Sequence, residues 1–104
     1  MWEMAEASGL GIEVSGDMIP VAPATQVICM TLGLDPLKLM SSGTLLVAVE
    51  QSKCWSVQKA LMKSPRRLTE VGKLTARSKG RVIVRRGKRE ALKPVSQDEL
   101  YKLA

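Results

Sequence analysis

The hydrophobic and polar positions of the chain follow two different periods. Spacings of three and four residues, typical of helices with one buried face, predict helices over residues 1–8, 23–32, 36–40 and 53–64. Alternating or continuous apolar runs, bounded by Gly, Pro and Ser, predict extended segments over residues 11–14, 44–49, 69–76, 81–86 and 90–95. Ser96 can cap a short terminal helix. The pattern predicts one α+β domain over residues 1–104, with a single mixed or antiparallel sheet and helices packed on one face.

Glycine, proline and aspartate mark the ends of the predicted helices. Gly9 and Gly33 are placed to stop the first two helices in left-handed turns. Pro23 fits the first turn of the second helix, and Asp35 can serve as the N-cap of the third. Because Gly11 follows Gly9 so soon, the pair fits either a close approach of the backbone to a ligand or a helix stop and a tight entry into a strand.

Residues 44–49 form a continuous apolar run after Thr44. Its length and its β-branched valines predict a strand that is buried on both faces. The second predicted helix is expected to bury Val27, Met30 and Leu34, and the helix over 53–64 is expected to bury Cys54, Val57, Ala60 and Leu61.

The composition excludes several kinds of chemistry within this chain. There is no His, so the commonest general base and metal ligand near neutral pH is absent, and so are Ser–His–Asp and Cys–His arrangements. Cys29 and Cys54 have neither CxxC nor zinc-site spacing. We expect reduced, partly buried thiols in a cytoplasmic compartment, with a disulfide as the alternative. No apolar run approaches the roughly 20 residues that span a membrane. The sequence predicts no catalytic residue and no metal site.

Positive charge is concentrated in the second half of the chain. The net charge is +6, yet Lys38 is the only basic residue among the first 50. The basic stretch over 77–93 fits either a face that follows a phosphate backbone or a charged edge that prevents aggregation. No aromatic residue is interleaved with these charges, so base stacking is not expected. The residues that would contact nucleic acid are Arg81, Arg85, Arg86, Lys88 and Arg89.

Several short motifs occur in a fixed order. Residues 4–14 (MAEASGLGIEV) are followed by residues 19–21 (IPV), residues 32–37 (LGLDPL) and residues 41–49 (SSGTLLVAV). This ordered set resembles the C-terminal domain of the AIR synthase-related family. The family includes aminoimidazole ribonucleotide synthetase, selenophosphate synthetase, thiamine-monophosphate kinase and the hydrogenase-maturation carbamoyl dehydratase. The pattern extends over residues 1–86 and is most similar to the hydrogenase-maturation branch and its archaeal relatives.

The resemblance implies a division of labour between two domains. Family members transfer phosphate from ATP to an oxygen, or consume ATP in an equivalent way. ATP and magnesium bind mainly on an Asp-rich N-terminal domain, which also forms the usual dimer, while the C-terminal domain closes over the substrate side of the cleft. The uncapped helix at Met1 fits a missing upstream part. The resemblance implies a domain that does not catalyse alone and that pairs with an N-terminal ATP-binding domain or forms a homo-oligomer.

The loop ahead of the apolar run is the candidate ligand contact. Backbone N–H groups in a Gly-containing loop can cradle an anion; a plain polar turn is the alternative. The contacting residues would be Ser41, Ser42, Gly43 and Thr44. Many relatives carry Glu where Ser42 stands, and a hydroxyl cannot replace a carboxylate as a base. The hydrogenase-maturation branch also ends in a reactive Cys that accepts a carbamoyl group, whereas this chain ends in residues 100–104 (LYKLA). The carbamoyl reaction is therefore not assigned.

Three functions follow from these observations. The first is the substrate-side C-terminal domain of an ATP-dependent, AIR synthase-related protein. The second is a stand-alone basic module that binds nucleic acid, and the third is a structural oligomerisation domain. Trp2, together with Met1 and Met4, is expected to expose an apolar face that fits a neighbouring domain or a second copy.

Overall fold

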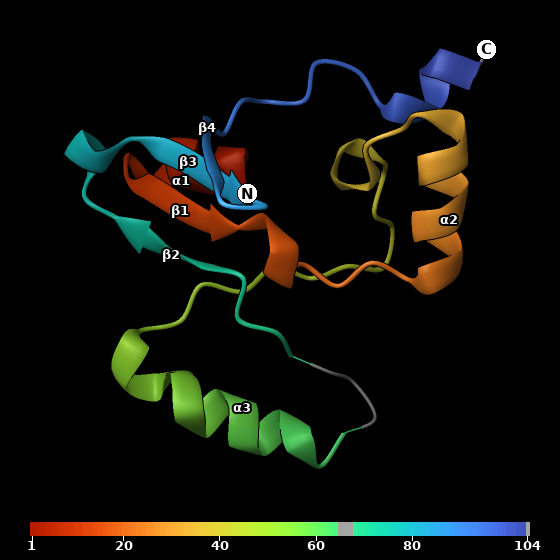
Figure 1. Cartoon of the computed structure of the whole chain (residues 1–104). Coiled ribbons are helices and arrows are strands. Elements are labelled where there is room, and N and C mark those ends of the chain that lie inside the picture. Colours follow the sequence, from red (N-terminus) through yellow and green to blue (C-terminus); the bar gives the residue numbers. More distant parts are fainter. Residues whose placement is uncertain (65–67, 104) are drawn as a thin grey trace.

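A four-stranded sheet forms the centre of the computed structural model, which describes residues 1–64 and 68–103 (Figure 1). Its strands are β1 (Gly11–Ser15), β2 (Gly72–Thr75), β3 (Arg81–Arg85) and β4 (Lys88–Ala91). They lie in the order β2-β1-β3-β4. β1 runs parallel to β3, whereas β1 with β2 and β3 with β4 are antiparallel pairs. The sheet is mixed, and the predicted α+β class is confirmed.

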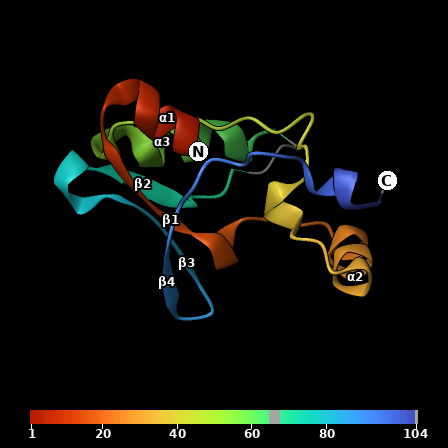
Figure 2. The same cartoon turned by 90° about the horizontal axis from the view of Figure 1, so that it is seen from above.

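α1 (Trp2–Ser8) packs against one face of this sheet, as Figures 1 and 2 show. Side chains alternate between the two faces of a strand, so Ile12 and Val14 of β1 share a face. They form the buried core together with Ile83 of β3 and Ala5 of α1. Leu74 of β2 packs against this cluster. Burial of one aliphatic side chain stabilises a fold by about 1.5–3 kcal/mol, so these few residues hold the centre of the chain together.

The predicted helix stops at Gly9 and Gly33 and the predicted cap at Asp35 are confirmed. Gly9 ends α1 and Gly33 ends α2 (Pro23–Leu32), each in the left-handed region with φ of 67°. The Asp35 carboxylate accepts a hydrogen bond from the Leu37 N–H at 3.0 Å, as expected of an N-cap. Local signals were sufficient here because each of these contacts lies within a few residues along the chain.

The β3–β4 hairpin closes through a two-residue turn. Arg86 and Gly87 have φ values of 49° and 75°, and positive φ at both central residues is the geometry of the turn that suits two twisted strands. β4 begins at Lys88, directly after this turn. The last strand was predicted over residues 90–95. It starts earlier because the turn is complete with Arg86 and Gly87, so Lys88 can already pair with β3.

Two glycines permit close contact between backbones. A Cβ on Gly72 would lie 2.3 Å from the carbonyl oxygen of Glu13, and one on Gly11 would lie 2.6 Å from the carbonyl oxygens of Ala76 and Gly80. Both distances are shorter than a real Cβ can adopt. Gly11 therefore serves entry into the strand, which is the second of the two alternatives given for it.

The predicted strand over residues 44–49 is wrong. The segment is extended but forms no ladder with any described strand. Leu45 is 82% exposed, and Leu46 and Val47 are exposed as well. An apolar run predicts a buried strand only if another strand lies beside it. That partner is far away in sequence, so the pattern could not supply it.

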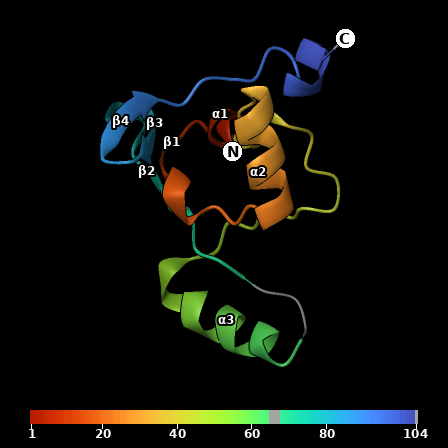
Figure 3. The ribbon, with the colours of Figure 1, turned by 45° about the vertical axis from the view of Figure 1, so that its right-hand side comes forward.

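α2 and α3 (Cys54–Met62) lie farther from the sheet than α1 does (Figures 1 and 3). Val27 and Met30 of α2 were predicted to be buried, yet both are exposed, Met30 by 72%. Leu34 is buried as predicted, and Cys29, which was not predicted, is buried as well. In α3 the predicted inner residues are half-buried, except Ala60, which is exposed. The amphipathic stripe is present in the sequence, but little of the chain packs against it.

Short 3-10 helices complete the chain: η1 (Gly16–Met18), η2 (Pro36–Lys38), η3 (Gln51–Lys53), η4 (Arg77–Lys79) and η5 (Glu99–Leu103). η2 is shorter than the helix predicted to reach residue 40, and β2 is shorter than the predicted strand over 69–76. The helix predicted over residues 53–64 ends at Met62, and residue 65, just past its predicted end, lies outside the described residues. No helix in the described part of the chain is long and apolar enough to cross a membrane.

The N-terminal apolar residues are more covered than expected. Met1, Trp2 and Met4 are each half-buried, and Met1 packs against the core. The Arg81 guanidinium lies over the Trp2 ring, 5.2 Å from its centroid. The predicted exposed apolar face at α1 is therefore wrong, because the basic hairpin covers part of it.

Candidate functional site

The loop at residues 41–44 joins η2 to the exposed apolar segment. The Thr44 N–H donates a hydrogen bond to the Ser41 carbonyl oxygen at 3.1 Å, and Gly43 has a φ of 86°. All four residues are exposed. Three hydroxyl groups therefore lie on one tight turn. They can donate or accept neutral hydrogen bonds, but the turn has no carboxylate of its own to act as a base.

Asp35 anchors the chain just ahead of this loop. One carboxylate oxygen caps η2, and the other lies 2.9 Å from Nη1 of Arg85 in β3. The Asp35 N–H also donates to the Glu99 carboxylate at 3.0 Å. This one residue thus ties the end of α2, the sheet and η5 together. The loop extends from a fixed point, although its own side chains face solvent.

Glu99 is a buried carboxylate with two partners. Lys102 Nζ lies 2.8 Å and 2.9 Å from its two oxygens, and the Asp35 N–H provides a further hydrogen bond. The Lys102 hydrogen bond, followed by that of Asp35, lowers the pKa of Glu99 below its usual value. The carboxylate is therefore charged at neutral pH and holds η5 beside the end of α2 (Figure 3).

Three of the five basic residues proposed to contact nucleic acid form ion pairs within the chain. Arg81 pairs with Glu6, Arg85 pairs with Asp35, and Arg89 pairs with Glu13 at 3.1 Å. The remaining two residues proposed for nucleic acid lie at the hairpin end. The Arg86 N–H donates to Asp17 at 2.8 Å, and Lys88 is exposed.

These pairs explain the uneven charge of the sequence. Each joins an acidic residue of the first half to a basic residue of the second, across the sheet and its neighbouring elements. A phosphate backbone would have to compete with carboxylates for three of the five guanidinium and ammonium groups. The geometry does not favour the nucleic-acid alternative.

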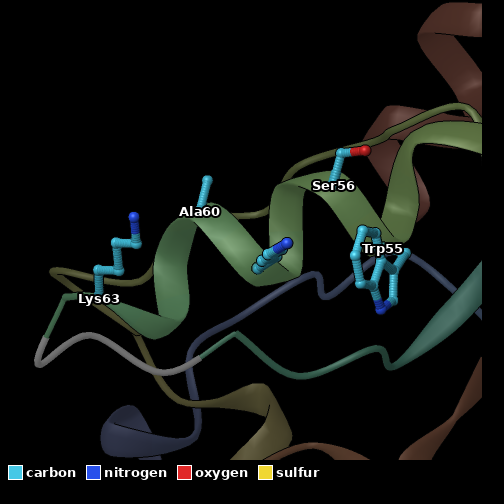
Figure 4. Close-up of a pocket in the computed structure, with 5 residues that line it drawn as sticks. Trp55, Ser56, Ala60 and Lys63 are labelled. Carbon is cyan, nitrogen blue, oxygen red and sulfur yellow. The ribbon is translucent and has the colours of Figure 1, made fainter.

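An open hollow of about 420 Å³ lies along α3. Figure 4 shows Ser56 and Ala60 pointing the same way from the helix, with Trp55 near one end and Lys63 near the other. Lys59 Nζ lies 4.8 Å from the centroid of the Trp55 ring. All of these side chains come from one helix, so the hollow is a surface feature and has no opposite wall.

The titratable side chains show no metal-binding arrangement in the described ranges. No group of three or more His, Cys, Asp or Glu residues comes close enough to hold an ion there. Both cysteines are free; Cys29 is buried and Cys54 is half-buried. The reduced thiols expected from the sequence are thus present in the structure.

The whole domain has known relatives. The family model described as AIR synthase related protein, C-terminal domain, matches residues 2–85. The chain belongs to the AIR synthase-related family. It is 40% identical over 89 residues to carbamoyl dehydratase HypE of Escherichia coli, a match that covers 86% of this chain. It is also 35% identical over 83 residues to a hydrogenase expression/formation protein of Methanocaldococcus jannaschii, covering 78% of this chain.

A solved structure confirms this family assignment. The crystal structure of Escherichia coli HypE, a hydrogenase maturation protein, matches with a TM-score of 0.79 and 34% identity. The match covers 93% of this chain but 32% of that protein. The chain spans about a quarter of the length of the curated relatives it matches. It corresponds to one AIR synthase-related C-terminal domain, as the motif order predicted.

Sequence reasoning missed the contacts that build the anchor of the loop. Asp35 was predicted as a cap, but its pairing with Arg85 and its link to Glu99 were not. The available signal was the acidic first half facing a basic second half. That signal predicts that ion pairs form between the two halves, but which residues pair depends on how the strands lie in the sheet.

Proposed function

We propose that this chain is the substrate-side domain of an ATP-dependent, hydrogenase-maturation-like protein and that it does not catalyse alone. The observation that carries this proposal is the pair of coverages in the structural match: 93% of this chain, and 32% of Escherichia coli HypE. A match of that form is one whole domain of a larger protein. The remaining steps, ATP and magnesium binding, then belong to a separate N-terminal ATP-binding domain.

In this proposal the loop of Ser41, Ser42, Gly43 and Thr44 contacts the substrate. Support comes from its position after η2, which Asp35 caps, and from its exposed hydroxyl and backbone groups. Such groups bind an anionic or hydroxyl-bearing substrate through neutral hydrogen bonds. Ser42 orients the substrate and takes no proton from it, because a hydroxyl is a poor base near neutral pH.

The division of labour is tested by calorimetry. Titration of the lone chain with ATP and magnesium should give no binding heat. The same titration is repeated after adding the separately produced part of Escherichia coli HypE that precedes the matched region, and ATP turnover is followed in the mixture. We expect turnover to rise when this chain is added. Tight, magnesium-dependent ATP binding by the lone chain would contradict the proposal.

The role of the loop is tested in the same mixture. Ser42→Ala removes one hydroxyl from the turn, and we expect it to lower the added turnover several-fold. Ser56→Ala is the matched control, because it removes a hydroxyl from the exposed surface of α3, outside the loop. Equal loss in both variants would show that the loop has no special part in the reaction.

A further inference from the structure

α3 has one face toward the rest of the domain and one face toward solvent. Its half-buried side chains recur at the spacings of a helix, and they are Cys54, Val57, Gln58 and Leu61. Trp55 and Met62 lie seven residues apart on the other side of the helix and are 68% and 82% exposed. Since α3 packs against its own domain through the half-buried stripe, the fold of the chain leaves the face of Trp55 and Met62 in solvent.

The same face of α3 is positively charged. Residues 51–64 contain three lysines and no Asp or Glu. Lys53 lies 3.4 Å from the Glu50 carboxylate, but neither Lys59 nor Lys63, both exposed, forms an ion pair within residues 1–64 and 68–103. The face therefore carries two ammonium groups that no carboxylate of the described chain neutralises, unlike the paired arginines of the β3–β4 hairpin.

Trp55 is restrained at one end of this face. Lys59 Nζ lies 4.8 Å from the centroid of the Trp55 ring, and this cation–π contact limits the motion of the indole. The hollow of about 420 Å³ runs from this ring to Lys63 (Figure 4). A restrained aromatic side chain beside a hollow is typical of the few residues that carry most of the binding energy of an interface. Because one helix lines the hollow, a partner would supply its opposite wall.

We propose that this face of α3 binds an acidic segment of another protein. An apolar side chain of that segment fills the hollow beside Trp55, and its carboxylates pair with Lys59 and Lys63. Charge complementarity selects this partner, because ammonium groups without a counter-charge attract carboxylates and repel basic surfaces. The binding face goes beyond the proposed function and does not depend on it.

Two other occupants fit this face less well. A second copy of the chain offers few carboxylates, because Glu6, Glu13 and Asp35 already pair with arginines. A helix that binds a membrane surface buries a broad apolar face in the lipid, whereas the apolar stripe of α3 lies toward its own domain. The outer face has only Trp55 and Met62 to offer a lipid, so an acidic protein segment is the better match.

Fluorescence anisotropy of a labelled acidic peptide, EELLEELLEELL, tests the proposal with the full chain. We expect saturable binding of this peptide and no binding of the peptide KKLLKKLLKKLL, in which the charge is reversed. Trp55→Ala should raise the dissociation constant by about 30-fold, as expected of a central aromatic anchor. Lys59→Gln combined with Lys63→Gln should raise it by about tenfold, and the remaining affinity should depend less on the salt concentration.

Two matched variants distinguish this face from nonspecific binding. Tyr101→Ala removes an aromatic side chain of similar exposure, 65%, from η5, and Lys88→Gln removes an exposed ammonium group from the hairpin. Both should leave the dissociation constant unchanged. Absence of peptide binding, or a loss in Lys88→Gln as large as that in the double lysine variant, would overturn the proposal. So would self-association of the chain, or its binding to phosphatidylserine vesicles, in place of peptide binding, if Trp55→Ala abolished it.

Discussion

The inner unit, residues 1–19 and 71–92, and the outer segment, residues 23–64, contrast sharply in packing. In the inner unit, apolar side chains meet between α1 and the sheet, and acidic and basic residues pair across it. The outer segment has comparable apolar stretches, yet Met30, Leu45 and Met62 are all largely exposed. Amphipathic patterning is therefore not sufficient for burial. A second surface has to lie opposite, and the outer segment has little of it within this chain.

The largest effect should come from the core of the inner unit. Ile83→Ala should lower the free energy of unfolding by about 2–5 kcal/mol, because it removes buried methyl groups and leaves a cavity; Ile83 is 5% exposed. Met62→Ala on α3 should change it by at most about 0.5 kcal/mol, since Met62 is 82% exposed. Urea denaturation of both variants makes the measurement. Similar losses would mean that the two regions are packed alike.

A smaller effect is expected where β2 joins the inner unit. Gly72→Ala places a Cβ 2.3 Å from the Glu13 carbonyl oxygen, and the backbone must shift at a cost of about 1–3 kcal/mol. Lys73→Ala, at the next position of the same strand, should cost about 0.5 kcal/mol or less. Thermal unfolding of the two variants compares them. If Gly72→Ala were as stable as Lys73→Ala, the close approach of the two strands would be wrong.

The coupling free energies of ion pairs are expected to differ between the two regions by less than the stability changes above. A double-mutant cycle on Asp35 and Arg85 is expected to give a coupling of up to about 1 kcal/mol, because both side chains are partly covered. The same cycle on Glu50 and Lys53, which are 71% and 69% exposed, should give about 0.3 kcal/mol. Couplings of equal size would show that the anchor ahead of the loop is no firmer than a surface pair.

The smallest expected effect is the loss of stability that Glu99 contributes when the pH becomes acidic. Because the folded-state pKa of Glu99 is lowered by the Lys102 hydrogen bond, its charge stabilises the fold above its unfolded-state pKa of about 4.3. This contribution is lost as the pH falls through the lower, folded-state value. The stability difference between the wild-type chain and Glu99→Gln should therefore be constant near neutral pH and shrink below about pH 4.

Lys102→Ala serves as the control for this acid effect. Without the Lys102 ammonium group, the Glu99→Gln substitution should produce a much weaker pH dependence, measured by urea denaturation across the same pH range. A difference that grew on acidification would carry the opposite sign and would contradict the pairing.

Prediction from the sequence succeeded where the deciding contacts were local. Gly9 and Gly33 end their helices, and Asp35 caps η2. For the candidate site, the sequence located the loop of residues 41–44 and the cap beside it. The Arg85 and Glu99 contacts that hold the cap join residues 50 and 64 positions apart, so no local pattern contains them.

The motif order alone was enough to assign the family, because it spans nearly the whole domain and needs no partner to be recognised. Burial was different. The run at residues 44–49 is as apolar as any core strand, and in this chain it lies in solvent, since a strand is completed by a neighbour that hydrogen-bonds to it. The basic hairpin likewise suggested a nucleic-acid face until Arg81, Arg85 and Arg89 were found beside Glu6, Asp35 and Glu13. Composition states how much charge and apolar surface a chain has, and only packing assigns each its partner.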